Sequence, residues 1–321
     1  MTFRAAARSA VVALCFGVLV VPSSAQDWRS GLTDRVGPSI VAVLPDLPPG
    51  EINQEEPEGT AFAIGDGRRL LTADHVLGRA NSVRLRLADG TMIAAEIAVR
   101  DPETDMATLS IAEPLPALEW GPDAKPGADI CVIGNAFGLG PSLTCGVVSA
   151  VERRGVGFNR VEDFVQTDAA INPGMSGAPL FAGDVGVVGM ASAIFTKTSD
   201  GNLGVNFAVS ARLLKAVVED MRDGQIDRGP QGLLLRPTVG PGETGTPHAE
   251  IVRIVPGSPE AASGLTTGDR LISIEALEIA GQPDYLTALA LFADRAETSY
   301  RVERDGARLN FTVTTQKRET P

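Results

Sequence analysis

Residues 166–180, QTDAAINPGMSGAPL, contain the turn from which the fold and the chemistry of this chain can be inferred. Pro173 and Gly174 predict a tight turn between two apolar runs, and Ser176 lies between this turn and Gly177. Because glycine lacks a Cβ atom, the turn can aim the backbone N–H groups of Gly174 and Ser176 at one point, as an oxyanion hole requires. A purely structural glycine-rich turn between strands is the alternative interpretation.

Histidine is a common general base for a serine nucleophile, and the chain contains 2 histidines. His75 follows the strand-like run RRLLTA at the start of a turn, whereas His248 lies in a loop rich in Gly and Pro. Asp105 stands directly before the apolar run MATLSI, from which its carboxylate can point into an interface. Asp101, four residues earlier, is interpreted as an ordinary turn acid.

The order of these residues along the chain separates the known classes of serine hydrolase. His75, Asp105 and Ser176 follow the order of chymotrypsin-like proteases. A subtilisin-like order needs an Asp before the His, and an α/β-hydrolase would need His248 as its base. Ala178 also breaks the G-x-S-x-G pattern of such hydrolases. The order therefore favours Ser176 as nucleophile, His75 as general base and Asp105 as the group that orients His75.

Short β-type runs alternate with turn residues from Ile40 to about Phe207, which predicts a mostly β fold built as a sandwich or as barrels. The composition agrees, since 35 Gly and 22 Pro in 321 residues favour many turns over a helical bundle. One amphipathic helix follows, with Ser210 as its cap and Gly224 at its end.

A second, smaller α+β unit follows the linker DGQIDRGPQG. It contains the strand-like runs AEIVRIV and RLISIEAL, a short helix opened by Ser258 and Pro259, the helix DYLTALALFA and a last hairpin that turns at Asp305 and Gly306. We therefore expect one domain over residues 26–227, a second over residues 228–316 and a tail over residues 317–321.

Residues 1–25 have the pattern of a signal peptide. Arg4 and Arg8 precede an apolar run over residues 10–21, and small residues end the segment at Ala25. The run is shorter than the ~20 residues that span a bilayer, so we expect cleavage, a periplasmic or secreted protein and no stable membrane span. An uncleaved N-terminal anchor is the alternative.

Charge and composition disfavour several other classes of protein. The formal net charge is −12, from 40 acidic residues against 28 Lys and Arg residues, and an acidic chain is a poor binder of nucleic acid. The 3 Cys and 2 His residues do not suit a structural zinc site. We therefore expect no metal and no cofactor.

Two cysteines of the exported chain lie in neighbouring predicted strands. ADICVIG and SLTCGVV are joined through NAFGLGP, and Cys131 and Cys145 are equally distant from Gly138 at its centre. Antiparallel pairing about Gly138 places the two cysteines directly opposite each other, which predicts a disulfide. A single bulge would shift the register and leave two free buried thiols, which is the alternative.

Five blocks in the first unit resemble the HtrA/Deg family of trypsin-like serine proteases, in order and in spacing. They are GTAFAIGDGRRLLTADHV, DPETDMATLSI, VIGNAFGLGPSLTCGVVSAV, QTDAAINPGMSGAPL and GVNFAVS. The second unit, with IVRIVPGSPEAASGLTTGDRLISIEAL, resembles the PDZ domain of that family. The resemblance covers about residues 30–316. It implies a chymotrypsin-like double β-barrel followed by a small α+β PDZ domain, and an exported serine endopeptidase that cleaves unfolded or damaged proteins, usually as a homotrimer.

The resemblance also implies a substrate pocket. Ala170 and Ile171 correspond to the primary pocket positions, with Val205 and Phe207 on the strand opposite. No acid lies at the base of such a pocket, so small or medium aliphatic residues are expected at the cleavage site rather than Lys or Arg. The family commonly has GNSGGP where this chain has GMSGAP, but the oxyanion donors are backbone groups.

The segment that corresponds to the carboxylate-binding loop of the PDZ domain is PQGL, with Gln231, Gly232 and Leu233 as the candidate peptide-binding residues. A peptide ligand is expected to add as a strand along AEIVRIV, opposite the helix over residues 284–292. The unusual PQGL and GMSGAP segments leave a second function open, in which the same fold serves as a proteolytically silent holdase or peptide-binding adaptor.

Overall fold

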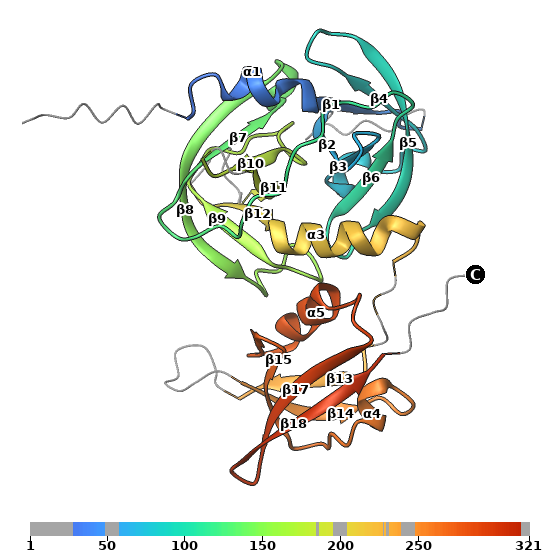
Figure 1. Cartoon of the computed structure of the whole chain (residues 1–321), viewed down its shortest axis with the longest axis vertical. Helices are drawn as coiled ribbons and strands as arrows, with labels where there is room; N and C mark the ends of the chain where they lie inside the picture. Colours follow the sequence, from blue (N-terminus) through green and yellow to red (C-terminus); the bar gives the residue numbers. More distant parts are fainter. Residues whose placement is uncertain are drawn as a thin grey trace, which may run out of the picture.

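The computed structural model describes residues 28–48, 58–183, 186–194, 204–226, 228, 231–238 and 248–315. The predicted signal peptide and the C-terminal tail lie outside these residues. Two closed barrels are followed by a smaller domain that holds one sheet (Figure 1). The predicted mostly β, double-barrel fold is therefore confirmed. No helix among the described residues has both the length and the apolar character needed to cross a membrane.

The first barrel is closed by antiparallel strands in the order β1-β2-β3-β6-β5-β4. Its interior is filled by apolar side chains such as Phe62, Leu70 and Leu85, which are fully buried. Two short helical turns, α1 (Leu32–Val36) and η1 (Gly37–Ser39), precede it, and α2 (Asp74–Leu77) follows β3. The strands are β1 (Ile40–Pro45), β2 (Gly59–Ile64), β3 (Arg69–Thr72), β4 (Val83–Arg86), β5 (Met92–Asp101) and β6 (Met106–Ser110).

The second barrel has the order β10-β11-β12-β9-β8-β7. The turn η2 (Ala136–Gly138) joins β7 to β8, the first two strands of this barrel along the chain. The strands are β7 (Asp129–Gly134), β8 (Ser142–Arg153), β9 (Phe164–Thr167), β10 (Pro179–Phe181), β11 (Val187–Ile194) and β12 (Asn206–Ser210).

Strands β7 and β8 pair in the register that the spacing about Gly138 predicts. Cys131 lies directly opposite Cys145, and a disulfide with an S–S distance of 2.03 Å joins them. Cys131 is fully buried and Cys145 is exposed, so the bond ties the surface strand β8 to the core strand β7.

Helix α3 (Ala211–Asp220) leaves the second barrel directly after β12. The Ser210 side chain accepts a hydrogen bond from the Leu213 N–H and caps the helix, as its position in the sequence predicts. The turn η3 (Met221–Asp223) extends α3, and Gly224 ends it with a φ of 89°.

The C-terminal domain holds a sheet with strands in the order β13-β14-β15-β17-β18, with β16 paired to β15. Because β14 lies between β13 and β15, the strand AEIVRIV cannot accept a further strand, and that prediction is wrong. The free edge next to α5 belongs to β13 instead. The elements are β13 (Leu233–Pro237), β14 (Ala249–Ile254), α4 (Pro259–Ala262), β15 (Arg270–Ile274), β16 (Leu277–Glu278), α5 (Gln282–Leu291), β17 (Glu297–Arg304) and β18 (Ala307–Thr314).

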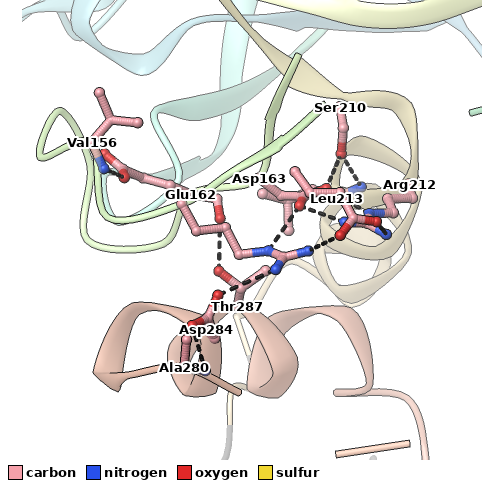
Figure 2. Close-up of polar contacts among 11 residues, drawn as sticks. Val156, Glu162, Asp163, Ser210, Arg212, Leu213, Ala280, Asp284 and Thr287 are labelled. Carbon is pink, nitrogen blue, oxygen red and sulfur yellow. Dashed lines mark hydrogen bonds and ion pairs between the residues drawn. The ribbon is translucent and has the colours of Figure 1, made fainter. Parts of the chain in front are cut away.

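Helix α5 contacts α3 and the loop between β8 and β9, so the C-terminal domain docks on the second barrel (Figures 1 and 2). Arg154 forms ion pairs with Asp163 of the barrel, at 3.1 Å, and with Asp284 of α5, at 3.2 Å. The buried Thr287 hydroxyl donates to the carbonyl oxygen of Glu162 at 2.7 Å. The contact between the domains therefore includes ion pairs and a hydrogen bond made by side chains that are little exposed.

Candidate active site

Loops of both barrels supply the three residues that the sequence predicts for catalysis. His75 lies in α2, directly after β3, and Asp105 lies in the turn between β5 and β6. Ser176 lies in the turn that leads into β10 of the second barrel. Asp105 and Ser176 are buried, whereas the His75 side chain is 41% exposed and so open to a substrate.

The Asp105 carboxylate holds His75 through both its backbone and its ring. The His75 backbone N–H donates to Oδ1 at 2.9 Å, and His75 Nδ1 lies 2.9 Å from Oδ1 and 2.8 Å from Oδ2. A carboxylate accepts but does not donate, so Nδ1 carries the proton toward Asp105. This tautomer leaves Nε2 as the basic nitrogen, which a general base needs.

Ser192 on β11 is a site residue that the sequence analysis did not identify. Its hydroxyl donates to Asp105 Oδ2 at 2.7 Å, and its side chain is buried. The contact links residues 87 positions apart in the sequence. Ser192 lies in an ordinary β-type run, VGMASAIF, and no local pattern distinguishes it.

The turn around Ser176 is fixed against the first barrel by Thr60. The Thr60 hydroxyl donates to the Gly174 carbonyl at 2.7 Å and accepts from the Asn135 N–H at 2.9 Å. The Thr60 N–H donates to the Ser176 carbonyl at 2.9 Å. Residues of both barrels thus position Ser176.

Both glycines of this turn are required by close contacts. Gly174 has a φ of +91°, and a Cβ atom there would lie 2.2 Å from the Asn135 carbonyl oxygen. Gly177 has a φ of +85°, and its Cβ would lie 2.0 Å from the Thr60 carbonyl oxygen. A side chain at either position would displace the backbone next to Ser176.

The residues that depart from GNSGGP point into the second barrel, because Met175 and Ala178 are both fully buried in its core. Another acidic side chain, Asp74, stands next to His75 in the sequence. Its carboxylate forms an ion pair with Arg100 at 2.5 Å, and its side chain is 9% exposed. Arg100 therefore compensates the extra negative charge beside His75.

The four residues predicted for the substrate pocket lie in the segment before the Ser176 turn and at the start of β12. Ile171 is buried and Ala170 is half-buried in the segment before the turn, and Val205 is half-buried. The Phe207 ring packs on Phe158 and Phe164, with centroids at 5.5 and 5.7 Å. Asn206 precedes Phe207 and faces the opposite side, because successive residues of a strand alternate between its two sides. The Asn206 Nδ2–H donates to the Ala169 carbonyl at 2.9 Å.

Asp101, which the sequence analysis interprets as a turn acid, accepts from the Glu103 N–H at the start of the turn between β5 and β6. It ends β5, is 3% exposed and forms an ion pair with Arg228 of the segment between the domains. Arg228 also lies 3.4 Å from Glu103. The loop that carries Asp105 is therefore held by a residue from the linker.

Gln231, Gly232 and Leu233 lie at the start of β13. The Gln231 Oε1 accepts a hydrogen bond from Arg160 at 2.8 Å, and Arg160 pairs with Glu103 at 3.2 Å. No group of three His, Cys, Asp or Glu residues suited to a metal ion is present in the described part of the chain.

A family model described as a trypsin-like peptidase domain matches residues 59–190. A probable periplasmic serine endoprotease, DegP-like, of Marinomonas sp. (strain MWYL1) is 34% identical over 281 residues, which cover 84% of this chain and 59% of that protein. A relative with the same description from Chlamydia trachomatis serovar D is 32% identical over 283 residues, which cover 83% of this chain and 56% of that protein. This chain therefore spans little more than half the length of these relatives.

Solved structures match over most of the chain. The HtrA-type protease AlgW with a tripeptide superposes with a TM-score of 0.71 at 30% identity, over 91% of this chain and 98% of that chain. AlgW with a decapeptide gives a TM-score of 0.69 at 28% identity, over 91% of this chain and 99% of that chain.

Proposed function

This chain belongs to the HtrA-type family of trypsin-like serine proteases, and on that premise we propose that it is a serine endopeptidase of the cell envelope that cleaves unfolded or damaged proteins. The observation that carries the proposal is the bonding of Asp105. Its carboxylate accepts from the His75 backbone, the His75 ring and the Ser192 hydroxyl. A buried carboxylate that accepts the Nδ1 proton of an exposed imidazole leaves Nε2 free to act as a general base.

The reaction proceeds in two halves. Ser176 Oγ attacks the carbonyl carbon of the peptide bond while His75 Nε2 takes the hydroxyl proton. The N–H groups of Gly174 and Ser176 stabilise the oxyanion, at about 3 kcal/mol for each donor. The carbon–nitrogen bond then breaks, and His75 gives its proton to the leaving amine. Water, deprotonated by His75, hydrolyses the acyl-enzyme and restores Ser176.

The pocket of this proposal is formed by Ala170, Ile171, Val205 and Phe207. None of these residues carries a charge, so the enzyme should prefer small or medium aliphatic residues at the cleavage site. The relatives are named periplasmic, which supports the proposed signal peptide at residues 1–25 and a periplasmic location.

The C-terminal domain is proposed to be a PDZ-type peptide-binding domain. Its sheet presents the β13 edge next to α5, which is the arrangement for strand addition. The AlgW structures were solved with peptides, which supports a peptide ligand for this chain as well. A homotrimer is proposed from the family resemblance.

A fluorophosphonate probe tests the proposed activity, because it reacts covalently with an activated serine nucleophile and hardly at all with ordinary serine hydroxyls. The chain without residues 1–25 should be labelled once and should degrade casein. Ser176→Ala should abolish both, with a loss of ~10⁶ in turnover. Heat-denatured protein controls for unspecific labelling. A folded protein that is neither labelled nor active would overturn the proposal and leave a silent binding protein.

A further inference from the structure

Two successive N–H groups at the start of β13 converge on one side-chain oxygen of the same domain. The Gly232 and Leu233 N–H groups donate to the Tyr285 hydroxyl at 3.0 and 3.3 Å. Tyr285 comes from α5 and is fully buried. Successive N–H groups that point at one place form a site for an anion, such as the carboxylate of a peptide C-terminus.

A buried carboxylate stands behind this hydroxyl. Tyr285 donates its proton to Glu260 Oε1 at 2.6 Å, and Glu260 in α4 is 2% exposed. The carboxylate lies so close to the loop that a Cβ atom on Gly232 would be 1.9 Å from Glu260 Oε2. Burial and the Glu260 charge raise the pKa of Tyr285, so the phenol remains a neutral donor. The loop therefore faces a hydrogen-bonded pair that carries one negative charge.

Backbone groups at the edge of β13 are also hydrogen-bonded by a side chain of α5. The Leu235 N–H donates to Gln282 Oε1 at 2.8 Å, and Gln282 Nε2 donates to the Leu233 carbonyl at 3.2 Å. A side-chain amide that bonds one N–H and one C=O of an edge strand makes the two contacts that the backbone of an added strand would make. Gln282 and Tyr285 lie on the same face of α5, three residues apart.

We propose that Tyr285, backed by Glu260, occupies the place of a ligand's terminal carboxylate and, with Gln282, closes the groove between β13 and α5 to peptides with a free C-terminus. A carboxylate brought to this loop meets no free N–H pair and faces the like charge of Glu260. Like charges at close range disfavour binding strongly where water is excluded. Tyr285 and Glu260 thus determine the specificity of the domain. This inference rests on the proposed peptide-binding role of the C-terminal domain.

The test compares peptides that differ only at their end. The probe is a fluorescein-labelled pool of decapeptides that end in Ala, Val, Leu or Phe, prepared either as free acids or as C-terminal amides. The protein is the chain without residues 1–25, with Ser176→Ala to prevent cleavage, and binding is measured by fluorescence polarisation. The unaltered groove should bind the acid pool no more tightly than the amide pool, because no site for the terminal carboxylate is open and the Glu260 charge repels it.

Opening the site should create a preference for the acid. In Tyr285→Ala with Glu260→Gln, the two N–H groups are free and the charge is gone, so the acid pool should bind at least about tenfold more tightly than the amide pool. Tyr300→Ala with Glu260→Gln is the matched control. Tyr300 is 2% exposed and lies in β17, so this pair of changes loosens the domain while Tyr285 of α5 still covers the loop.

Circular dichroism confirms that each variant is folded, and Tyr285→Phe with Glu260→Gln replaces the alanine variant if that one unfolds. A strong preference for the acid pool in the unaltered groove would overturn the inference. The inference would also be overturned if the folded variants that lack the Tyr285 hydroxyl and the Glu260 charge did not prefer the acid pool. Protease activity is measured separately on the chain with Ser176, so that failure of the proposed endopeptidase is distinguished from failure of this inference.

Discussion

Arg228 forms a buried ion pair with Asp101 at the end of β5, so the segment between the two domains holds the loop that carries Asp105. The two side chains are 9% and 3% exposed. Asp101 also accepts from the Glu103 N–H at 3.2 Å and from the Thr104 hydroxyl. Burial lowers the pKa of Arg228 to about 10, so the side chain is a cation at neutral pH.

Arg228→Met should lower the free energy of unfolding by roughly 3–5 kcal/mol, because Asp101 is left as a buried charge without its partner. Urea unfolding followed by circular dichroism measures this loss. Arg222→Met is the control, since its ion pair with Glu219 is exposed and is worth less than about 1 kcal/mol. Adding Asp101→Asn should restore part of the stability. Equal losses in the two Met variants would contradict the role of Arg228.

Ser192→Ala should reduce kcat/KM by roughly 10- to 100-fold, because it removes a charge-assisted hydrogen bond to Asp105. Asp105→Asn should cost about 10⁴, because an amide leaves the His75 ring in the wrong tautomer. Ser39→Ala, the same change at a buried serine of η1, is the control for stability. If Ser192→Ala retains full activity against a peptide substrate, then Asp105 is positioned without this hydroxyl.

Thr287→Val should weaken the docking of the C-terminal domain by about 1–3 kcal/mol, because the buried Glu162 carbonyl loses its donor (Figure 2). We expect two separate transitions by calorimetry and faster cleavage of the linker by an added protease. Thr315→Val is the matched control, since the Thr315 hydroxyl donates to the Arg295 carbonyl oxygen at an exposed site in the same domain. Identical melting of the two variants would show that Thr287 does not hold the domains together.

Much of the fold could be predicted because its signals are local. Alternation and turn residues indicated the strands, Ser210 and Gly224 marked the ends of a helix, and equal spacing about Gly138 gave the pairing of Cys131 with Cys145. Each of these signals depends on residues close in sequence.

The parts that could not be predicted depend on contacts between distant residues. Ser192 lies 87 positions from Asp105, and Arg228 lies 127 positions from Asp101. The runs AEIVRIV and GLLLR have similar strand patterns, and only the order of the finished sheet shows that β13 is the edge.

The disulfide should contribute up to about 3 kcal/mol, because it closes a short loop in the unfolded chain. Reduction should lower the melting temperature of the barrels by roughly 5–10 °C. Cys131→Ala with Cys145→Ser should melt at the temperature of the reduced protein and should not respond to reductant. Alkylation of the unfolded, non-reduced protein checks the bond itself. Mass spectrometry that finds Cys131 and Cys145 modified without reduction would refute it.

Alkaline pH should unfold the C-terminal domain, because both tyrosines of the chain lie in its core. Burial, reinforced by the Glu260 charge, raises the pKa of Tyr285 and of Tyr300 above the ordinary value. The folded domain therefore binds these two protons more tightly than the unfolded chain does. The stability from this difference is complete below the unfolded pKa of about 10 and is lost as the pH rises above it.

The expected loss is about 1.4 kcal/mol per pH unit for each tyrosine that ionises only on unfolding. Absorbance at 295 nm follows tyrosinate, and far-ultraviolet circular dichroism follows the fold. The two signals should change together in one cooperative step, and Tyr285→Phe should halve the tyrosinate amplitude. If tyrosinate instead forms gradually around pH 10 while the dichroism stays native, the phenols are open to solvent, and the buried pair of Tyr285 and Glu260 does not exist.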